Sequence, residues 1–167
     1  MKTSELTGVA LDWTVATCVG EVTEIRYDGI AWRFKLDGKT KVLAKGWAAS
    51  MTWNPSTNWA LGGPIIQRED ISIIRADDEH VIGSDGFCVP GQRTPLWVAA
   101  KGQNSTQCSY ESEHYPDQYE ICEADVIYGP TPLIAAMRVY VLSQLGAEVE
   151  VPKGLACLQR LSEGTPS

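Results

Sequence analysis

The segment from residue 131 to residue 146 constrains the fold of this chain more than any other stretch. Thr131 can cap a helix, Pro132 suits the first helical position, and Gly146 provides a stop after the last apolar residue. The predicted helix is apolar nearly all round, and its few polar exceptions are Arg138, Ser143 and Gln144. One sheet face cannot bury every side of such a helix. We therefore expect an inserted segment or a second subunit to cover the rest.

The remainder of the chain predicts a second helix and several short strands. A helix capped by Thr7 runs to about Val19 and stops at Gly20, and its apolar residues on two faces favour a homo-oligomer. Asp37-Gly38 is a turn signal between two strand-like runs and predicts a β-hairpin. The expected strands cover residues 30–36, 40–43, 71–75, 96–100 and 124–128. The predicted class is α+β: a small antiparallel sheet with an N-terminal and a C-terminal helix.

Two polar, Gly-containing stretches interrupt the expected strands and predict long loop insertions at residues 76–93 and 101–123. A chain of 167 residues fits one domain of ordinary size. We place that domain at residues 1–160, followed by a frayed tail over 161–167.

Composition narrows the class of partner. The net charge is −7, and the 14 Lys and Arg residues are spread thinly, so no basic stripe is available for duplex nucleic acid. The start of the chain lacks the pattern of a secretory leader, and no apolar run approaches the length of a membrane span. Five scattered cysteines suit reduced thiols. We expect a cytoplasmic protein without a membrane partner.

Catalytic and metal-binding groups are sparse. The chain has two histidines, His80 and His114, both in the expected insertions. Cys108, His114 and Cys122 match no common zinc spacing, and no nucleotide-binding glycine motif is present. We expect no metal, no cofactor and no enzymatic activity.

The start of the C-terminal helix is the first candidate ligand site. Free N–H groups, the Thr131 hydroxyl and the positive end of the helix dipole could meet an anion near Tyr128, and Arg138 follows two turns later. The alternative is simple helix capping, with an arginine at the edge of the domain.

A loop expected from Gly46 to Pro64 is the second candidate site. Two of its tryptophans, Trp53 and Trp59, could sandwich a planar base. Ser56, Thr57 and Asn58 could recognise the polar edges of that base. Gly62 and Gly63 could allow the ligand to approach the backbone closely, and Arg68 could bind a phosphate. The alternative is that these tryptophans, together with Trp47, pack in the core.

Three stretches carry a resemblance. Residues 4–13 read SELTGVALDW, residues 55–66 read PSTNWALGGPII, and residues 128–138 read YGPTPLIAAMR, followed by VEVP at 149–152. In this order they resemble the NinX-like family of phage and prophage proteins, a family of unknown function. The excursions from 76 to 123 look longer than in typical members, and Asn58 stands where aspartate is common. The Trp, Pro-Ser and Trp-Ala pattern is also loosely similar to phage anti-defence sponge proteins, which sequester nucleotide-derived immune signals.

These resemblances imply a phage accessory protein that acts inside the infected bacterial cell. We expect it to bind a signal such as a cyclic ADP-ribose isomer or a cyclic oligonucleotide, as a homo-oligomer with pockets at subunit edges. One alternative is a protein-interaction module that inhibits a host enzyme. Another is a small hydrolase of such signals that uses His80 and His114.

Overall fold

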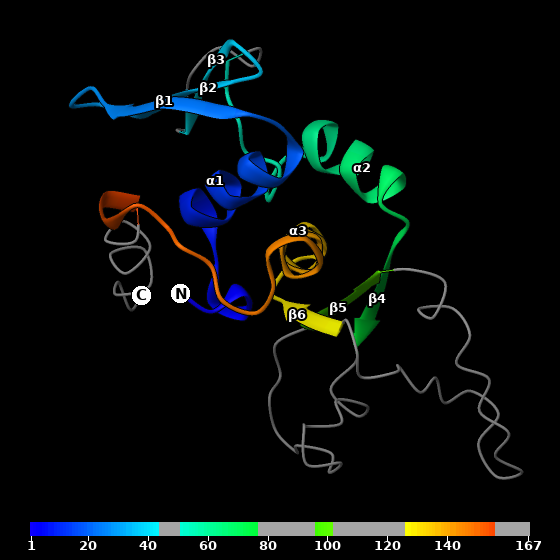
Figure 1. Cartoon of the computed structure of the whole chain (residues 1–167). Helices are drawn as coiled ribbons and strands as arrows, with labels where there is room; N and C mark the ends of the chain where they lie inside the picture. Colours follow the sequence, from blue (N-terminus) through cyan, green and yellow to red (C-terminus); the bar gives the residue numbers. More distant parts are fainter. Residues whose placement is uncertain (44–50, 77–95, 102–125, 156–167) are drawn as a thin grey trace, which may run out of the picture.

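The computed structural model describes residues 1–43, 51–76, 96–101 and 126–155. Their helices and strands pack around one hydrophobic core and stack in layers: a sheet, a central helix, two further helices and a second sheet (Figure 1). The α+β class is confirmed. Almost all of the expected insertions and the whole expected tail lie outside the described residues.

Helix α3 (Pro132–Leu145) forms the middle of the molecule, as Figure 1 shows nearly end-on. It packs against a sheet in which all neighbouring strands are antiparallel, in the order β4 (Ile71–Ala76), β5 (Leu96–Lys101) and β6 (Val126–Gly129). Thr131, Pro132 and Gly146 cap, begin and end this helix as predicted, and Gly146 has a φ of +88°.

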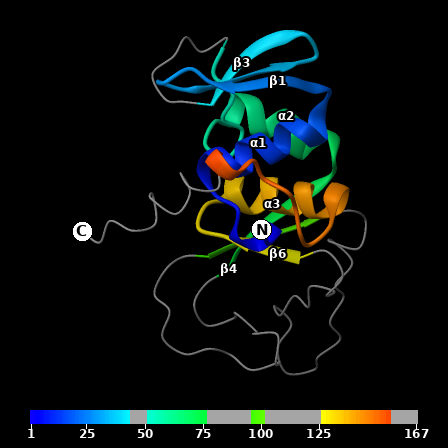
Figure 2. The same cartoon turned by 60° about the vertical axis from the view of Figure 1, so that its left-hand side comes forward.

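Helices α1 (Gly8–Val19) and α2 (Trp59–Arg68) pack against α3 away from that sheet. Beyond α1 lies the second sheet, as both views show (Figure 2). Trp13 of α1 meets Phe34 of that sheet edge to face, with ring centroids 5.6 Å apart. Both α1 and α3 are therefore covered on two sides within one chain. This removes the physical reason for which we expected an oligomer.

The second sheet contains the predicted hairpin. Its strands are β1 (Val22–Tyr27), β2 (Trp32–Leu36) and β3 (Lys39–Leu43), paired antiparallel in that order. Asp37 and Gly38 both have positive φ, 48° and 75°, as a type I′ turn requires. Strand β1 was not expected from the sequence, and the single predicted sheet is in fact two.

Helix α2 corrects the expected loop at 46–64. We predicted a loop there because the stretch is rich in Trp, Asn, Pro and Gly, and the last two are poor helix formers. The helix nevertheless forms from Trp59 onward, because Ile65 is buried in the core and the Asn58 side chain caps the first turn. Tertiary packing and capping here outweigh local propensity.

The N-terminus is tied to the segment that follows α3. Residues Thr3–Glu5 form a short 3₁₀ helix, η1. The amino group of Met1 donates to the carbonyl of Val149 at 2.9 Å, and Thr3 Oγ1 donates to the carbonyl of Gly146 at 2.7 Å. The N-terminus and the segment after α3 are thus held together.

Candidate functional site

The start of α2 presents an exposed tryptophan. The backbone N–H groups of Ala60, Leu61 and Gly62 donate to the side chain or the carbonyl of Asn58, at 2.9 to 3.0 Å. Trp59 is the first residue of the helix, and 55% of its surface is exposed. An indole this open on a capped helix start offers a ring face to a planar group. Thr57 beside it is also exposed.

Trp53 has the opposite environment. It is 7% exposed, and its Nε1 donates to the backbone carbonyl of Asp12 at 2.9 Å. Ser56 is buried too, and its N–H donates to Asp12 Oδ1 at 2.8 Å. Trp53 and Ser56 therefore fasten the segment before α2 to α1. The structure does not bring Trp53 and Trp59 together as two walls of a base-stacking slot, because the ring of Trp53 is packed in the core.

Asp12 is a buried anchor that was not predicted from the sequence. Burial, as the main cause, raises the pKa of its carboxyl to about 7, while the N–H and the hydroxyl of Ser56 lower it. The Ser56 hydroxyl is fully buried and makes no hydrogen bond of normal geometry with a described group. With a pKa of about 7, the Asp12 carboxyl is close to half-protonated at neutral pH. The sequence held one sign of this burial, an aspartate in a helix that is apolar on two faces.

The two glycines of α2 have different surroundings. A Cβ atom on Gly62 would lie 2.6 Å from the carbonyl oxygen of Pro55 and 2.7 Å from Leu133 Cδ2. At Gly63 the nearest atom would be Trp59 Cε3, at 4.0 Å. Gly62 therefore serves packing between α2, the preceding loop and α3. Close approach to a ligand stays a prediction for Gly63 alone, where an added Cβ would make only an ordinary contact with Trp59.

The start of α3 lies beside these residues, so the two candidate sites of the sequence analysis meet at Gly62 and Leu133. Thr131 Oγ1 accepts from the N–H of Ile134 at 3.2 Å, which is ordinary capping. Thr131 is exposed, and 38% of Tyr128 is exposed. These two side chains are accessible near the start of α3.

Arg138 is a structural tether. It is 8% exposed, its Nε donates to the carbonyl of Leu6 at 2.8 Å, and its Nη1 donates to the carbonyl of Tyr128 at 2.7 Å. The guanidinium thereby joins α3 to Leu6, which directly follows η1, and to β6. The interpretation of Arg138 as an anion-binding residue is replaced by this role, since its donors are used inside the fold.

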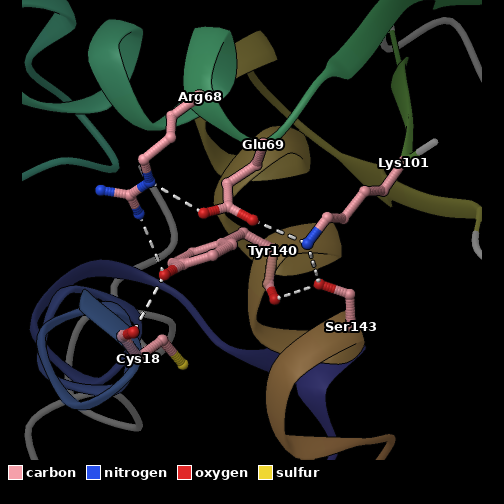
Figure 3. Close-up of polar contacts among 6 residues, drawn as sticks. All are labelled: Cys18, Arg68, Glu69, Lys101, Tyr140 and Ser143. Carbon is pink, nitrogen blue, oxygen red and sulfur yellow. Dashed lines mark hydrogen bonds and ion pairs between the residues drawn. The ribbon is translucent and has the colours of Figure 1, made fainter. Parts of the chain in front are cut away.

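Arg68 belongs to a polar cluster at the other end of α2 (Figure 3). Its Nε donates to Glu69 Oε1 at 2.9 Å and its Nη2 to the hydroxyl of Tyr140 at 3.3 Å. The other Glu69 oxygen accepts from Lys101 Nζ at 2.8 Å, and this ammonium also reaches Ser143 Oγ at 3.2 Å. Half of the Arg68 side chain is exposed, at 53%. The cluster carries two cations and one carboxylate.

The ionisable groups of this cluster shift one another. The hydrogen bond from Lys101 is the main cause that lowers the pKa of Glu69, and the bond to Glu69 is the main cause that raises the pKa of Arg68. Burial raises the pKa of Tyr140, whose hydroxyl donates to the carbonyl of Cys18 at 3.0 Å. Burial likewise raises the pKa of the Cys18 thiol to about 11, so this thiol stays protonated at neutral pH. Only Arg68 of this cluster was predicted, because pairing across long stretches of sequence leaves no local signal.

Trp59 and Arg68 lie at the two ends of α2 and on different sides of it. At about 100° and 1.5 Å per residue, they are roughly half a turn apart around the axis and about 13 Å apart along it. One chain therefore does not present the indole and this guanidinium to the same compact ligand.

A separate hollow lies where the N-terminus meets the segment that follows α3. It has a volume of about 300 Å³ and is lined by Lys2, Thr3, Ser4, Ile127, Leu142, Ala147 and Glu148. None of the predicted site residues lines it.

Several residues named in the sequence analysis fall outside the described ranges. They are Trp47, His80, Cys108, His114 and Cys122. Among the described residues, no group of His, Cys, Asp and Glu side chains is arranged to hold a metal ion. Likewise, none of the helices in the described ranges is long and apolar enough to cross a bilayer.

Comparison with known proteins identifies the family. The model of the family described as Bacteriophage P22, NinX matches residues 2–86, about half of the chain. The match spans η1 to β4 and includes both the Asp12 anchor and the exposed Trp59. It ends before the stretch at 128–152 that also carried the resemblance. A search of curated proteins gave no match. The chain belongs to the phage NinX family.

Proposed function

We propose that this chain is a phage accessory protein that binds and sequesters a nucleotide-derived signal of bacterial immunity, such as a cyclic ADP-ribose isomer or a cyclic oligonucleotide. Membership of a phage protein family supports the accessory role. The observation that carries the ligand class is Trp59, a tryptophan left 55% exposed at a rigid helix start. Its ring can stack on a nucleobase, which contributes about 1 to 3 kcal/mol per base in proteins that bind single strands.

Polar groups around Trp59 suit the rest of a nucleotide. The Thr57 hydroxyl is exposed, and the Asn58 side chain is half-buried beside it. The N–H groups of Ala60, Leu61 and Gly62 donate to Asn58, whereas the N–H of Trp59, the first of the helix, makes no bond to Asn58. A phosphate at this position would meet the positive end of the helix dipole. Thr131 and Tyr128 add two exposed side chains at the neighbouring start of α3.

Arg68 supplies the second half of the proposed site, and it does so from another copy of the chain. Its Nη1 atom takes no part in the bonds to Glu69 and Tyr140, so the guanidinium can still donate to a phosphate. Because Trp59 and Arg68 of one chain lie on different sides of α2, a compact ligand contacts both only between two copies. A homo-oligomer is therefore part of the proposal.

The proposed action is binding without turnover. The described ionisable groups near the start of α2 are poorly placed for acid–base chemistry, because Asp12 is buried under Ser56. Glu69 is held by two cations at the far end of the helix, and the Cys18 thiol is protonated at neutral pH.

Thermal melting and calorimetry with a panel of cyclic ADP-ribose isomers and cyclic oligonucleotides test the proposal. Wild type should melt higher with at least one member of the panel, and Trp59→Ala should lose at least about tenfold in affinity, corresponding to loss of the stacking energy. Leu145→Ala is the matched control, since it removes an apolar side chain of similar exposure, 48%, at the end of α3. A panel without any melting shift, or equal loss in both variants, would overturn the proposal.

A further inference from the structure

The turn between β1 and β2 exposes apolar side chains at a projecting point of the molecule. Figure 1 shows this hairpin extending beyond the helices at the upper left. At its tip Ile30 is 77% exposed and Tyr27 is 55% exposed. Ile30 is the most exposed of the large apolar side chains that the structure describes. Water contact for an isoleucine of this kind costs about 2 to 3 kcal/mol relative to burial.

The tip is held rigidly by its own hydrogen bonds. Asp28 Oδ1 accepts from the N–H groups of Ile30 at 3.0 Å and Ala31 at 2.9 Å, while Asp28 Oδ2 pairs with Arg33. The Tyr27 hydroxyl donates to the carbonyl of Gly29 at 3.1 Å. The hydrogen bonds that the Asp28 carboxylate accepts, first of all the one from the N–H of Ala31, lower the pKa of Asp28 to about 2.

Ring packing and strand geometry add to this rigidity. The ring of Tyr27 packs against that of Trp32 across the strands, with centroids 5.5 Å apart. Upstream, the pairing of β1 with β2 is irregular between Thr23 and Arg26, and a bulge of this kind bends a strand. An apolar residue presented by a preorganised turn loses little conformational entropy on binding.

The charge left at the tip is positive. The two carboxylates of this hairpin arm, Glu24 and Asp28, are paired with Lys35 and Arg33. Arg26 is exposed, and no described carboxylate forms an ion pair with it. A surface that receives Ile30 would therefore be complementary if it were acidic around an apolar pocket.

We propose that the β1–β2 tip is a docking point for a protein partner, with Ile30 inserted into an apolar pocket and Arg26 facing an acidic rim. The convex, rigid shape of the tip calls for a concave partner surface. Tyr27 lies against the wall of that pocket. This docking is a second function, separate from the ligand site at Trp59.

Two other occupants fit the tip less well. A lipid surface would gain the burial of one isoleucine and part of one tyrosine but would have to take up the Asp28–Arg33 pair at the same depth. A second copy of the chain would have to supply the acidic-rimmed pocket. The hollow lined by Lys2 and Glu148 does not supply one, because Glu148 is its one carboxylate and Lys2 lies beside it.

Photo-crosslinking of the full chain in bacterial cells tests the proposal. One variant carries p-benzoylphenylalanine in place of Ile30, and the matched control carries it in place of Thr40, an exposed residue of the same sheet away from the tip. We expect one protein to be crosslinked from position 30 and not from position 40. Mass spectrometry of the crosslinked peptide should place it at an apolar pocket with an acidic rim.

The purified pair then gives the affinity. Ile30→Asp should weaken the complex by at least about 30-fold, as loss of a central interface anchor does, while Thr40→Asp should change it less than about threefold. Both variants should melt as wild type, since neither side chain is buried. Equal or absent crosslinking at the two positions would overturn the proposal, as would crosslinks to a second copy alone. Ile30-dependent binding to phosphatidylglycerol vesicles without a protein partner would overturn it in favour of a membrane.

Discussion

At the scale of single residues, burial decides which polar side chains can meet a ligand. Arg138 and Arg68 look equivalent in the sequence, yet Arg138 donates to two carbonyls inside the fold and Arg68 remains half exposed. Arg138 Nε and Nη1 reach carbonyls on two different elements, a geometry that the single ammonium of lysine does not reproduce.

Arg138→Lys should therefore destabilise the protein by about 2 to 4 kcal/mol, because one ammonium cannot keep both the buried bond to Leu6 and the partly buried bond to Tyr128. Urea denaturation of the variant measures this loss. Arg26→Lys is the control and should cost less than about 0.5 kcal/mol, since Arg26 is exposed. Equal effects of the two substitutions would contradict the tether.

Asp12 predicts an unusual dependence of stability on pH. Its folded-state pKa of about 7 lies above the unfolded value of 3.8, so between these values the folded state holds a proton that the unfolded state has lost. The free energy of unfolding should therefore fall as pH rises through this window, by roughly 2 to 3 kcal/mol between about pH 5 and 8. Asp28 and Glu69 have lowered pKa values and titrate below this range.

Asp12→Asn isolates the contribution of this carboxyl. The amide oxygen can still accept from the N–H of Ser56, so the variant should lose the Asp12 part of the slope and exceed wild type in stability at pH 8. Urea melts at the two pH values measure both quantities. An unchanged slope in the variant would show that Asp12 is not the titrating group.

At the scale of elements, α2 depends on contacts that its own sequence does not indicate. Its glycines are adjacent, yet only Gly62 faces a backbone carbonyl and Leu133 of α3. A Cβ at Gly62 would force α2 away from both, while a Cβ at Gly63 has room.

Gly62→Ala should cost about 1 to 3 kcal/mol through overpacking. By contrast, Gly63→Ala should stabilise the helix by up to about 1 kcal/mol, because alanine restricts the unfolded chain and favours the helix. Chemical denaturation of the two variants compares them directly. A gain in stability for Gly62→Ala would contradict the close packing of α2.

Signals within a few residues of the sequence were sufficient to predict some helices and turns but not others. The caps of α3 and the Asp37-Gly38 turn were predictable because their chemistry lies within a few residues. Helix α2 was not, since Gly62, Gly63 and Pro64 oppose it locally and tertiary contacts decide. The candidate site shows the same limit: Trp53 is buried and bonded to Asp12, which is far away in the sequence, whereas Trp59 stays exposed.

At the scale of the whole molecule, the described elements place α3 between the sheet of β4, β5 and β6 and the helices α1 and α2, and the second sheet lies beyond α1. The apolar circumference of α3 is satisfied within one chain, so it does not demand a second subunit. Oligomerisation is proposed instead from the separation of Trp59 and Arg68 on α2. The phage family match covers the half of the chain that contains both residues.

Native mass spectrometry tests the central claim most directly. Full-length protein would be purified from cells with an active nucleotide-signalling defence, weighed intact, and heated to release bound molecules. We expect a symmetric oligomer that releases an unmodified cyclic nucleotide, about one for each pairing of Trp59 with Arg68, and loses it in Trp59→Ala. A ligand-free monomer after challenge with the nucleotide panel, or release of a hydrolysed product, would contradict sequestration.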